Sequence, residues 1–238
     1  MISVRTLGGV EIHGDAGSDD ALLRGEPMRL ALFIFLAANG RRFLSRSHVA
    51  SLFWPASDEA RGRNALRQAL HRIRSVLGND IVEARGRAEI RLNPELVECD
   101  AVLFEEAARG DEPMKALRLY PGKFMIGFDA SLPAPAETWF QDNAHRLHRL
   151  AVRCASGMAE QAERKGDLSG AARLWERALF LSPYDEDALR HLMRVYAEQG
   201  SPGVALQKYQ QTVERLERDL GIEASEETRA LASSLSGG

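Results

Sequence analysis

The spacing of hydrophobic and polar positions changes along the chain, and each change predicts a different element. Residues 2–14, ISVRTLGGVEIHG, alternate around a Gly-Gly turn and predict a pair of short strands. Residues 26–39 are apolar on nearly every side, with Pro27 in the first turn and Gly40 after the end. Since proline suits the first turn of a helix and glycine its end, this pattern predicts a buried helix.

Two further helices follow in quick succession. The first is expected over residues 45–54, because Ser45 is a good N-cap and Pro55 stops the helix. The second begins after an N-cap, either Ser57 or Asp58, and ends at a glycine. Its apolar residues recur three and four positions apart and form one stripe: Ala65, Leu66, Ala69, Leu70, Ile73 and Leu77.

A β-hairpin is expected directly after these helices. Residues 80–93, DIVEARGRAEIRLN, alternate on both sides of a turn that contains Gly86. Strands, three helices and a hairpin within the first 95 residues are typical of a winged helix-turn-helix. The predicted first domain is therefore residues 1–95, an α+β winged helix-turn-helix.

The remainder, residues 96–238, is predicted to be an all-α domain of tetratricopeptide-like repeats, so the protein as a whole is mainly α. Three pairs of positions are 34 residues apart, which is the tetratricopeptide period: Gly166 and Gly200, Ala171 and Ala205, Trp175 and Tyr209. The segments AVLFEEAARG and PMKALRLY are expected to add another helix pair. Residues 120–137 are rich in turn residues but apolar, and we expect them to pack against the helices or the first domain.

Charge separates the two predicted domains. The whole chain has a net charge of −3, but its first 93 residues contain 14 Arg, no Lys and 10 acidic residues, and are therefore net positive. A basic domain beside an acidic one indicates different partners, with a polyanion as the candidate for the first. The longest apolar run is too short to span a membrane and the start has no signal-peptide pattern. We therefore expect a cytoplasmic protein without a membrane partner.

The basic residues concentrate on the third predicted helix. Residues 60–74 contain five arginines and no acid. A helical wheel places the apolar stripe on one side of the helix. The other side carries Arg61, Asn64, Gln68, His71, Arg72 and Ser75, and Arg63, Arg67 and Arg74 lie beside the stripe. Arg pairs with guanine, Asn and Gln pair with adenine, and any exposed Arg can neutralise a phosphate. This pattern predicts a recognition helix in the major groove of double-stranded DNA.

An arginine-rich helix can also be an ordinary solvated surface, and two other basic elements decide between these interpretations. Arg85 and Arg87 are expected at the tip of the hairpin, where a wing reaches the minor groove or the backbone. Arg46, at the start of the preceding helix, is expected to contact a phosphate through its side chain and the helix N-terminus. Together these elements favour DNA binding.

The chain resembles the antibiotic-regulatory-protein class of bacterial transcriptional activators, in which a response-regulator type winged helix precedes a bacterial transcriptional activator domain. The matching stretches include LFWPASDEARGRNALRQALHRIRSVLG, LYPGKFMIGF, LPAPAETWFQDNAHRLHRL and GDLSGAARLWERALFLSPYDEDALRHLMRVYAEQG, and the resemblance covers residues 29–228. It implies an activator that binds promoter repeats and recruits RNA polymerase through the sigma and alpha subunits. One departure lies in the wing, where Arg87 follows the glycine and the family more often has an aromatic residue.

Two other functions stay open. The chain is a helical-repeat adaptor if its winged helix no longer binds DNA, with a groove lined by Trp175, Tyr196 and Tyr209 as the binding surface. An enzyme is disfavoured because no nucleophile signature or phosphate-binding GxxxxGK[ST] motif is present. His145 and His148 lie three residues apart, but no cysteine or carboxylate stands at ligand spacing. No metal, cofactor or catalytic residue is therefore expected, and the helical domain is expected to dimerise or contact a protein.

Overall fold

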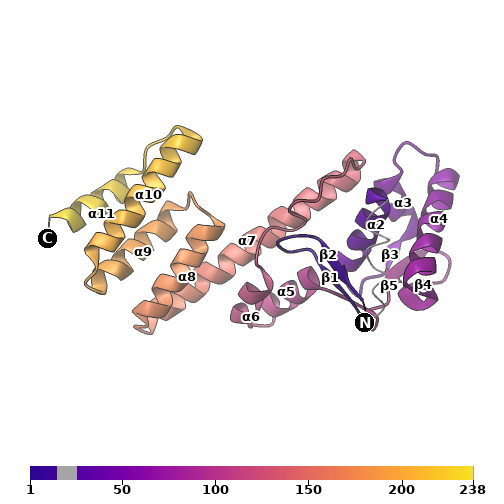
Figure 1. Ribbon diagram of the computed structural model, residues 1–238, viewed down its shortest axis with the longest axis horizontal. Helices are drawn as coiled ribbons and strands as arrows, with labels where there is room; N and C mark the ends of the chain where they lie inside the picture. Colours follow the sequence, from indigo (N-terminus) through magenta and orange to yellow (C-terminus); the bar gives the residue numbers. More distant parts are fainter. Residues whose placement is uncertain (15–25, 238) are drawn as a thin grey trace. The chain divides into compact units, whose positions relative to one another are not determined.

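The structure, a computed structural model, describes residues 1–14 and 26–237. The chain divides into two compact units, residues 1–148 and residues 149–238 (Figure 1). The predicted fold class is confirmed: strands and three helices form a winged helix-turn-helix, and helices make up the rest. The predicted domain boundary near residue 95 lies inside the first unit and stays a prediction about domain organisation.

A three-stranded sheet begins the first unit. Strand β1 (Ile2–Arg5) pairs antiparallel with β2 (Glu11–His13), which confirms the predicted strand pair. On its other side β1 pairs in parallel with β6 (Val97–Cys99), with Ile2 opposite Val97. The sequence analysis did not predict β6, because three residues are too few to show an alternating pattern.

One carboxylate fixes the end of β1. Asp100, the first residue of α5 (Asp100–Arg109), accepts hydrogen bonds from the backbone N–H of Thr6 and of Leu7, each at 2.9 Å. It also accepts one from the Thr6 hydroxyl at 2.6 Å. Thr6 is fully buried and Leu7 is 4% exposed, so these donors have little access to water. The first residues of the chain are therefore held by a residue beyond position 95.

Three helices form the core of the winged helix-turn-helix. They are α2 (Pro27–Ala38), α3 (Arg46–Phe53) and α4 (Glu59–Leu77), within two residues of the predicted bounds. The helix α2 buries every residue from 30 to 37, as its apolar sequence predicts. Of the predicted α4 stripe, Leu66, Leu70 and Ile73 are buried, and Ala65, Ala69 and Leu77 are partly buried.

The caps of these helices agree in part with the sequence analysis. Asp58 is the N-cap of α4, and its carboxylate accepts a hydrogen bond from the N–H of Arg61 at 2.8 Å. Ser45 occupies the N-cap position of α3, but its hydroxyl contacts the hydroxyl of Ser47 at 2.8 Å and makes no capping hydrogen bond. The predicted N-cap position of α3 is therefore confirmed, although the Ser45 hydroxyl does not bond to the first turn of the helix.

The predicted hairpin is confirmed as a wing. Strands β4 (Val82–Arg85) and β5 (Glu89–Leu92) pair antiparallel, joined to α4 by a short 3-10 helix at Asn79–Ile81. Gly86 turns the chain with φ +62°, a conformation that favours glycine. The two-residue strand β3 (Leu44–Ser45) pairs with β5 and places the start of α3 beside the wing.

The turn-rich segment packs against the N-terminal strand, as predicted. It lies between α6 (Pro113–Leu119) and α7 (Ala134–Arg164). The N–H of Met125 donates to the carbonyl of Thr6 at 2.7 Å, and the N–H of Gly8 donates to the carbonyl of Lys123 at 3.0 Å. The segment therefore continues the pairing of the first sheet.

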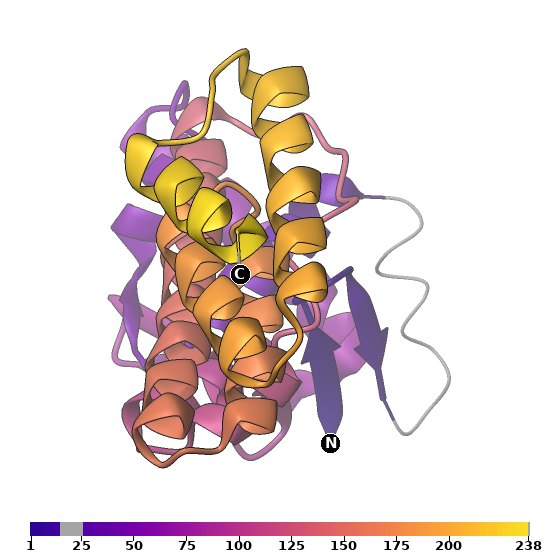
Figure 2. The ribbon, with the colours of Figure 1, turned by 90° about the vertical axis from the view of Figure 1, so that its left-hand side faces the viewer.

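Four helices follow α7 in the second unit (Figure 2). They are α8 (Leu168–Leu181), α9 (Glu186–Glu198), α10 (Pro202–Leu220) and α11 (Glu226–Ser236). They form two helical hairpins, and the repeated residues fill equivalent places. Gly166 and Gly200 both turn the chain with φ +72°, and Ala171 and Ala205 are both fully buried. The predicted 34-residue repeat is thus confirmed.

The three aromatic residues suggested to line an adaptor groove differ in their exposure. Trp175 is only 3% exposed, stacks on the ring of His191 with centroids 4.6 Å apart, and donates a hydrogen bond to Glu163. Tyr196 and Tyr209 are partly buried and pack against the cluster of α9, α10 and α11. Trp175 is therefore part of the core, while Tyr196 and Tyr209 are left partly accessible to solvent.

A carboxylate at the start of α9 holds the start of α11, and this contact predicts a pH dependence. Burial alone raises the pKa of Glu186, but hydrogen bonds from Thr228 and Ser225 and the charge of Arg190 lower the pKa below its ordinary value of 4.5. A lowered pKa stabilises the fold above the ordinary value, and this stabilisation is lost as the pH falls through the folded pKa. We expect Glu186→Gln to destabilise the chain at pH 7 and to have less effect below pH 4.5.

Urea unfolding of both proteins at a series of pH values measures this difference in the free energy of unfolding. Glu217→Gln is the matched control, since Glu217 is an exposed carboxylate of α10 and its side chain forms no hydrogen bond or ion pair with the described residues of α11. A destabilisation by Glu186→Gln that stays constant down to pH 3 contradicts the prediction.

Candidate nucleic-acid interface

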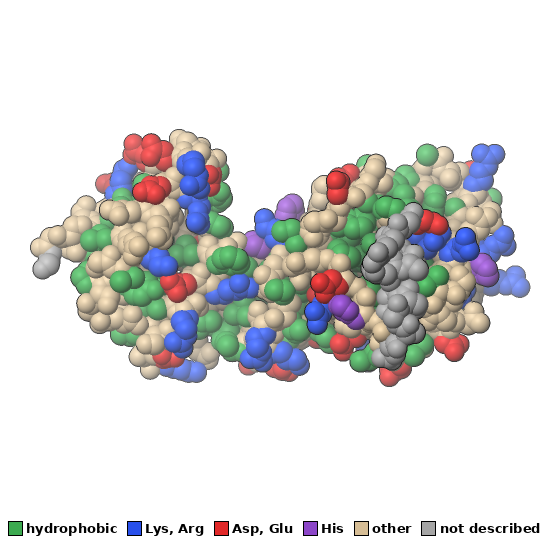
Figure 3. All heavy atoms as spheres, in the orientation of Figure 1, with side chains coloured by type: hydrophobic (Ala, Val, Ile, Leu, Met, Phe, Trp, Pro, Cys, Tyr) green, Lys and Arg blue, Asp and Glu red, His purple; other side chains and the backbone are tan. Residues whose placement is uncertain are grey.

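The outer face of α4 is exposed along its length. All seven α4 residues predicted to bind DNA are solvent-exposed, and Figure 3 shows Lys and Arg side chains gathered at the edge of the first unit where Figure 1 places α4. They are Arg61, Arg63, Asn64, Arg67, Gln68, His71 and Arg72. The opposite face packs through Leu66, Leu70 and Ile73 onto the core of the first unit. The amphipathic pattern thus places the polar face in solvent.

Two of the arginines have acidic partners that the sequence analysis did not assign. Arg61 lies 3.3 Å from the carboxylate of Asp58, and Arg63 pairs with Glu59. Although residues 60–74 contain no acid, the two acids just before them reach the first turns of α4. Both pairs are largely exposed, and exposed ion pairs contribute about 0–1 kcal/mol, so a phosphate can replace either acid at low cost.

The middle of α4 carries the polar groups best placed to bind a base edge. Arg67 donates from Nη2 to the amide oxygen of Asn64 at 2.6 Å, which orients both side chains. The side chains of Gln68 and His71 are exposed and make no hydrogen bond with other described residues. A planar guanidinium and free amide or imidazole groups match the donors and acceptors in the major groove.

Arg46 and Arg74 lie closer to the protein body than the outer face. Arg74 donates to the carbonyl of Val82 at 3.0 Å and so joins α4 to the wing. Burial, and then the neighbouring charge of Arg74, lower the pKa of Arg46. The backbone N–H of Arg46 donates to the carbonyl of Ala88 at 2.8 Å. This N–H is therefore already paired within the fold, and the predicted phosphate contact through the side chain of Arg46 and the N-terminus of α3 stays a prediction.

The wing presents Arg87 and restrains Arg85. Arg85 pairs with Glu89 at 2.5 Å, and this hydrogen bond raises the pKa of Arg85 and lowers the pKa of Glu89. The guanidinium groups of Arg85 and Arg91 lie over the ring of Phe43, 4.6 and 4.3 Å from its centroid. Arg87 is exposed in the turn. Phe43 and Arg91 were not among the predicted site residues. The only sequence feature that points to them is a single aromatic residue just before the two residues that form β3.

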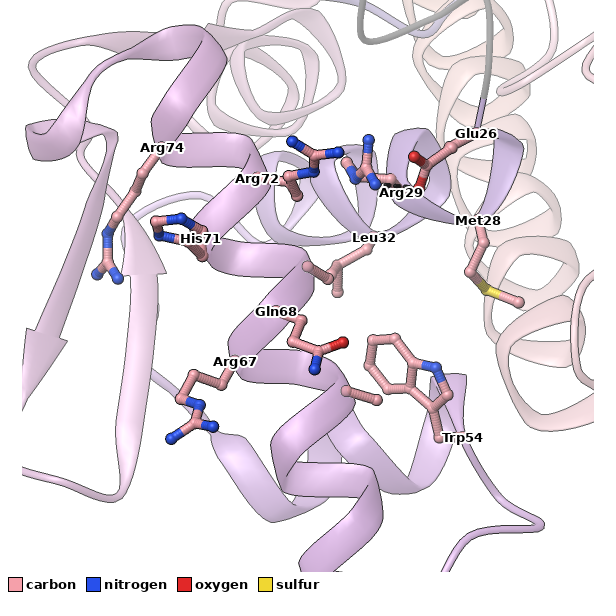
Figure 4. A pocket seen from close by; sticks show the side chains of 12 residues that line it. Glu26, Met28, Arg29, Leu32, Trp54, Arg67, Gln68, His71, Arg72 and Arg74 are labelled. Atoms are coloured by element: carbon pink, nitrogen blue, oxygen red, sulfur yellow. Dashed lines mark hydrogen bonds and ion pairs between the residues drawn. The ribbon is translucent and has the colours of Figure 1, made fainter.

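A hollow of about 810 Å³ lies beside α4, between α2 and the end of α3 (Figure 4). Its floor includes Leu32, Trp54 and Ala69, and its rim carries basic side chains. Figure 4 shows Arg67 and Arg74 on the side of α4 that faces the wing strands, and Arg72 on the other side. This hollow was not predicted, because its lining comes from three helices whose packing the sequence pattern does not specify.

His148, one of the two histidines considered as metal ligands, lies against Tyr120. His148 contacts the hydroxyl of Tyr120 through Nδ1 at 3.2 Å. Within residues 1–14 and 26–237, no group of three or more His, Cys, Asp or Glu side chains is placed to hold a metal ion. None of the helices in these ranges is long and apolar enough to cross a membrane.

Comparison with known proteins agrees with this architecture. The bacterial transcriptional activator domain family matches residues 103–236, more than half of the chain. A search of curated proteins finds no match. Among solved structures, Mycobacterium tuberculosis EmbR, in complex with a low affinity phosphopeptide, has a TM-score of 0.63 and 20% identity. The likeness covers 99% of this chain but 65% of EmbR, so the chain spans less than two thirds of that protein, and at this identity it shows the fold alone.

The region that matches the family begins at residue 103 and includes the helical repeats. The winged helix-turn-helix precedes this region in the sequence. This is the order of domains that the sequence resemblance implied. The chain therefore belongs to the bacterial transcriptional activator domain family.

Proposed function

We propose that this chain is a sequence-specific DNA-binding regulator that activates transcription. The observation that carries the proposal is the exposed face of α4, where Asn64, Arg67, Gln68 and His71 stand between arginines and away from the core. A helix of this width enters the major groove, and the second helix of a helix-turn-helix is the one that does so. Here that helix is α4, which follows α3.

The side chains divide into two roles. Asn64, Arg67, Gln68 and His71 lie in the middle of α4 and bind base edges. The phosphate contacts come from the cations around them: Arg46, Arg61, Arg63, Arg85 and Arg87. Arg61, Arg63 and Arg85 exchange their acidic partners for phosphate, while Arg87 at the wing tip reaches the backbone or the minor groove. No cofactor takes part in this mechanism.

The second unit provides the protein contacts. Its helical hairpins belong to the activator domain, and we infer that they contact RNA polymerase, through its sigma and alpha subunits, or a second copy of the chain. A homodimer requires two half-sites at a spacing set by the DNA helical repeat. Since the ligand is chromosomal DNA, the protein acts in the cytoplasm.

Salt titration of DNA binding tests the proposal. The full chain is used to select duplexes from a random pool, and affinity is measured by fluorescence anisotropy between 50 and 300 mM salt. Each phosphate contact contributes about 0.9 to the slope of log affinity against log salt, so four contacts give a slope of about −3 to −4. Absence of selection, or a slope near zero, overturns the proposal and favours an adaptor whose winged helix does not bind DNA.

A further inference from the structure

A second basic site lies on the flank of α4 away from the wing. Arg72 of α4 and Arg29, in the first turn of α2, line the same hollow, and Figure 4 shows both side chains directed to one edge of it. The Arg29 side chain is only 17% exposed. Its Nε is buried and is the one buried side-chain nitrogen or oxygen of the described residues without a hydrogen-bond partner. Buried donors are almost always satisfied, so an unsatisfied one indicates an acceptor that is absent here.

The charge of the hollow indicates the kind of acceptor. Among the described residues that line it are four arginines and one histidine, and Glu26 is the only carboxylate of this set. Glu26 pairs with Arg29, while Arg72 makes no ion pair with the described residues. The floor is apolar, formed in part by Leu32 and Trp54, and a less polar surrounding strengthens charge interactions. These features favour an anion with several acceptor oxygens.

We propose that Arg29 and Arg72 together hold one backbone phosphate of the bound DNA. This inference rests on the proposed function, since it takes α4 to lie in the major groove. A helix in that groove has a sugar-phosphate strand on each side. The wing serves one strand, and the edge with Arg29 and Arg72 faces the other. A phosphodiester has two charged oxygens, and guanidinium groups bind such oxygens through parallel donors.

The proposal reassigns Arg72. The sequence analysis grouped Arg72 with the base-reading face, but its place at the rim of the hollow makes it a phosphate ligand. It also adds Arg29, which no sequence pattern singled out because α2 is otherwise an apolar helix. Both residues then position the duplex and contribute no base preference.

Salt slopes of four proteins test the inference: the wild type, Arg29→Gln, Arg72→Gln and the double variant. Each is measured on a selected duplex and on an unrelated duplex of equal length. We expect Arg29→Gln to weaken binding to both duplexes by similar factors. If the two arginines share one phosphate, the slope of log affinity against log salt is less steep by about 0.9 in the double variant. Two separate phosphate contacts would reduce the slope by about 1.8. Arg118→Gln, an exposed arginine of α6 in the same unit, is the control that leaves the slope unchanged.

Two outcomes separate this inference from the proposed function. If the wild type binds DNA with a steep slope but Arg29→Gln and Arg72→Gln bind as the wild type does, only the inference is overturned. If the wild type does not bind DNA, both fail. Thermal unfolding checks that Arg29→Gln is folded. If Arg29→Gln is unfolded, Arg72→Gln still tests the inference, because Arg72 is exposed and its substitution does not disturb the core.

The Nε–H resonance of Arg29 distinguishes DNA from a free anion. The buried Nε–H is a specific probe in side-chain ¹H–¹⁵N spectra of the full chain, assigned by comparison with Arg29→Gln. We expect this resonance to shift when either duplex is added and to stay unchanged with inorganic phosphate at the same ionic strength. A shift with inorganic phosphate and none with duplex overturns the DNA assignment in favour of a free-anion site.

Discussion

Arg67→Ala is expected to lower the affinity for the selected duplex by about 10- to 100-fold, because a two-pronged contact with a base discriminates by about 1–3 kcal/mol. Arg67 is exposed midway along α4, on the side that faces the wing, and Asn64 holds its guanidinium in place through a hydrogen bond of 2.6 Å. The loss falls on the selected duplex more than on an unrelated one. Anisotropy titrations with both duplexes measure the ratio.

Arg67→Lys separates the charge of the side chain from its shape. Lysine keeps the positive charge but lacks the planar pair of donors. We therefore expect Arg67→Lys to keep the salt slope of the wild type and to lose most of the preference for the selected duplex. Arg118→Ala on α6 is the matched control. If Arg67→Lys retains full preference, Arg67 contacts a phosphate and base reading belongs to Gln68 and His71.

Asp100→Ala is expected to destabilise the first unit by roughly 3 kcal/mol, because hydrogen bonds to a charged group contribute about 1.5–3 kcal/mol each and are not additive. The substitution leaves the buried N–H groups of Thr6 and Leu7 and the Thr6 hydroxyl without their acceptor. We expect amide exchange in residues 1–14 to accelerate, and mass spectrometry of that peptide measures the change.

Two further variants define this prediction. Asp100→Asn keeps one acceptor oxygen without its charge, so its effect should lie between the wild type and Asp100→Ala. Asp142→Ala removes an exposed carboxylate of α7 in the same unit and should leave exchange in residues 1–14 unchanged. Equal exchange in Asp100→Ala and the wild type contradicts the role given to this carboxylate.

Local patterns account for the parts of the fold that were predictable. The apolar α2, the stripe on α4, the hairpin around Gly86 and the 34-residue repeat each depend on residues close in sequence. The same holds for the exposed face of α4, since the helical period alone separates it from the stripe. Periodicity therefore identified the elements and the candidate recognition helix.

The unpredicted parts depend on contacts between distant residues. The pairing of β6 with β1 joins Val97 to Ile2, and no pattern in either strand specifies the partner. The ring of Phe43 under Arg85 and Arg91, and the hollow shared by Arg29 and Arg72, likewise require the packed structure. Charge composition also misled: Asp58 and Glu59 neutralise arginines that a count of residues 60–74 treats as free.

The parallel pairing of β1 with β6 has a consequence for synthesis of the chain. Contacts between residues far apart in sequence form late, because the intervening segment must first be closed into a loop. The three helices and the wing lie between the two strands and depend on shorter separations. During translation, the three helices and the wing can therefore fold first, while β1 has only β2 as a neighbour and keeps one open edge until Val97 and Asp100 have left the ribosome.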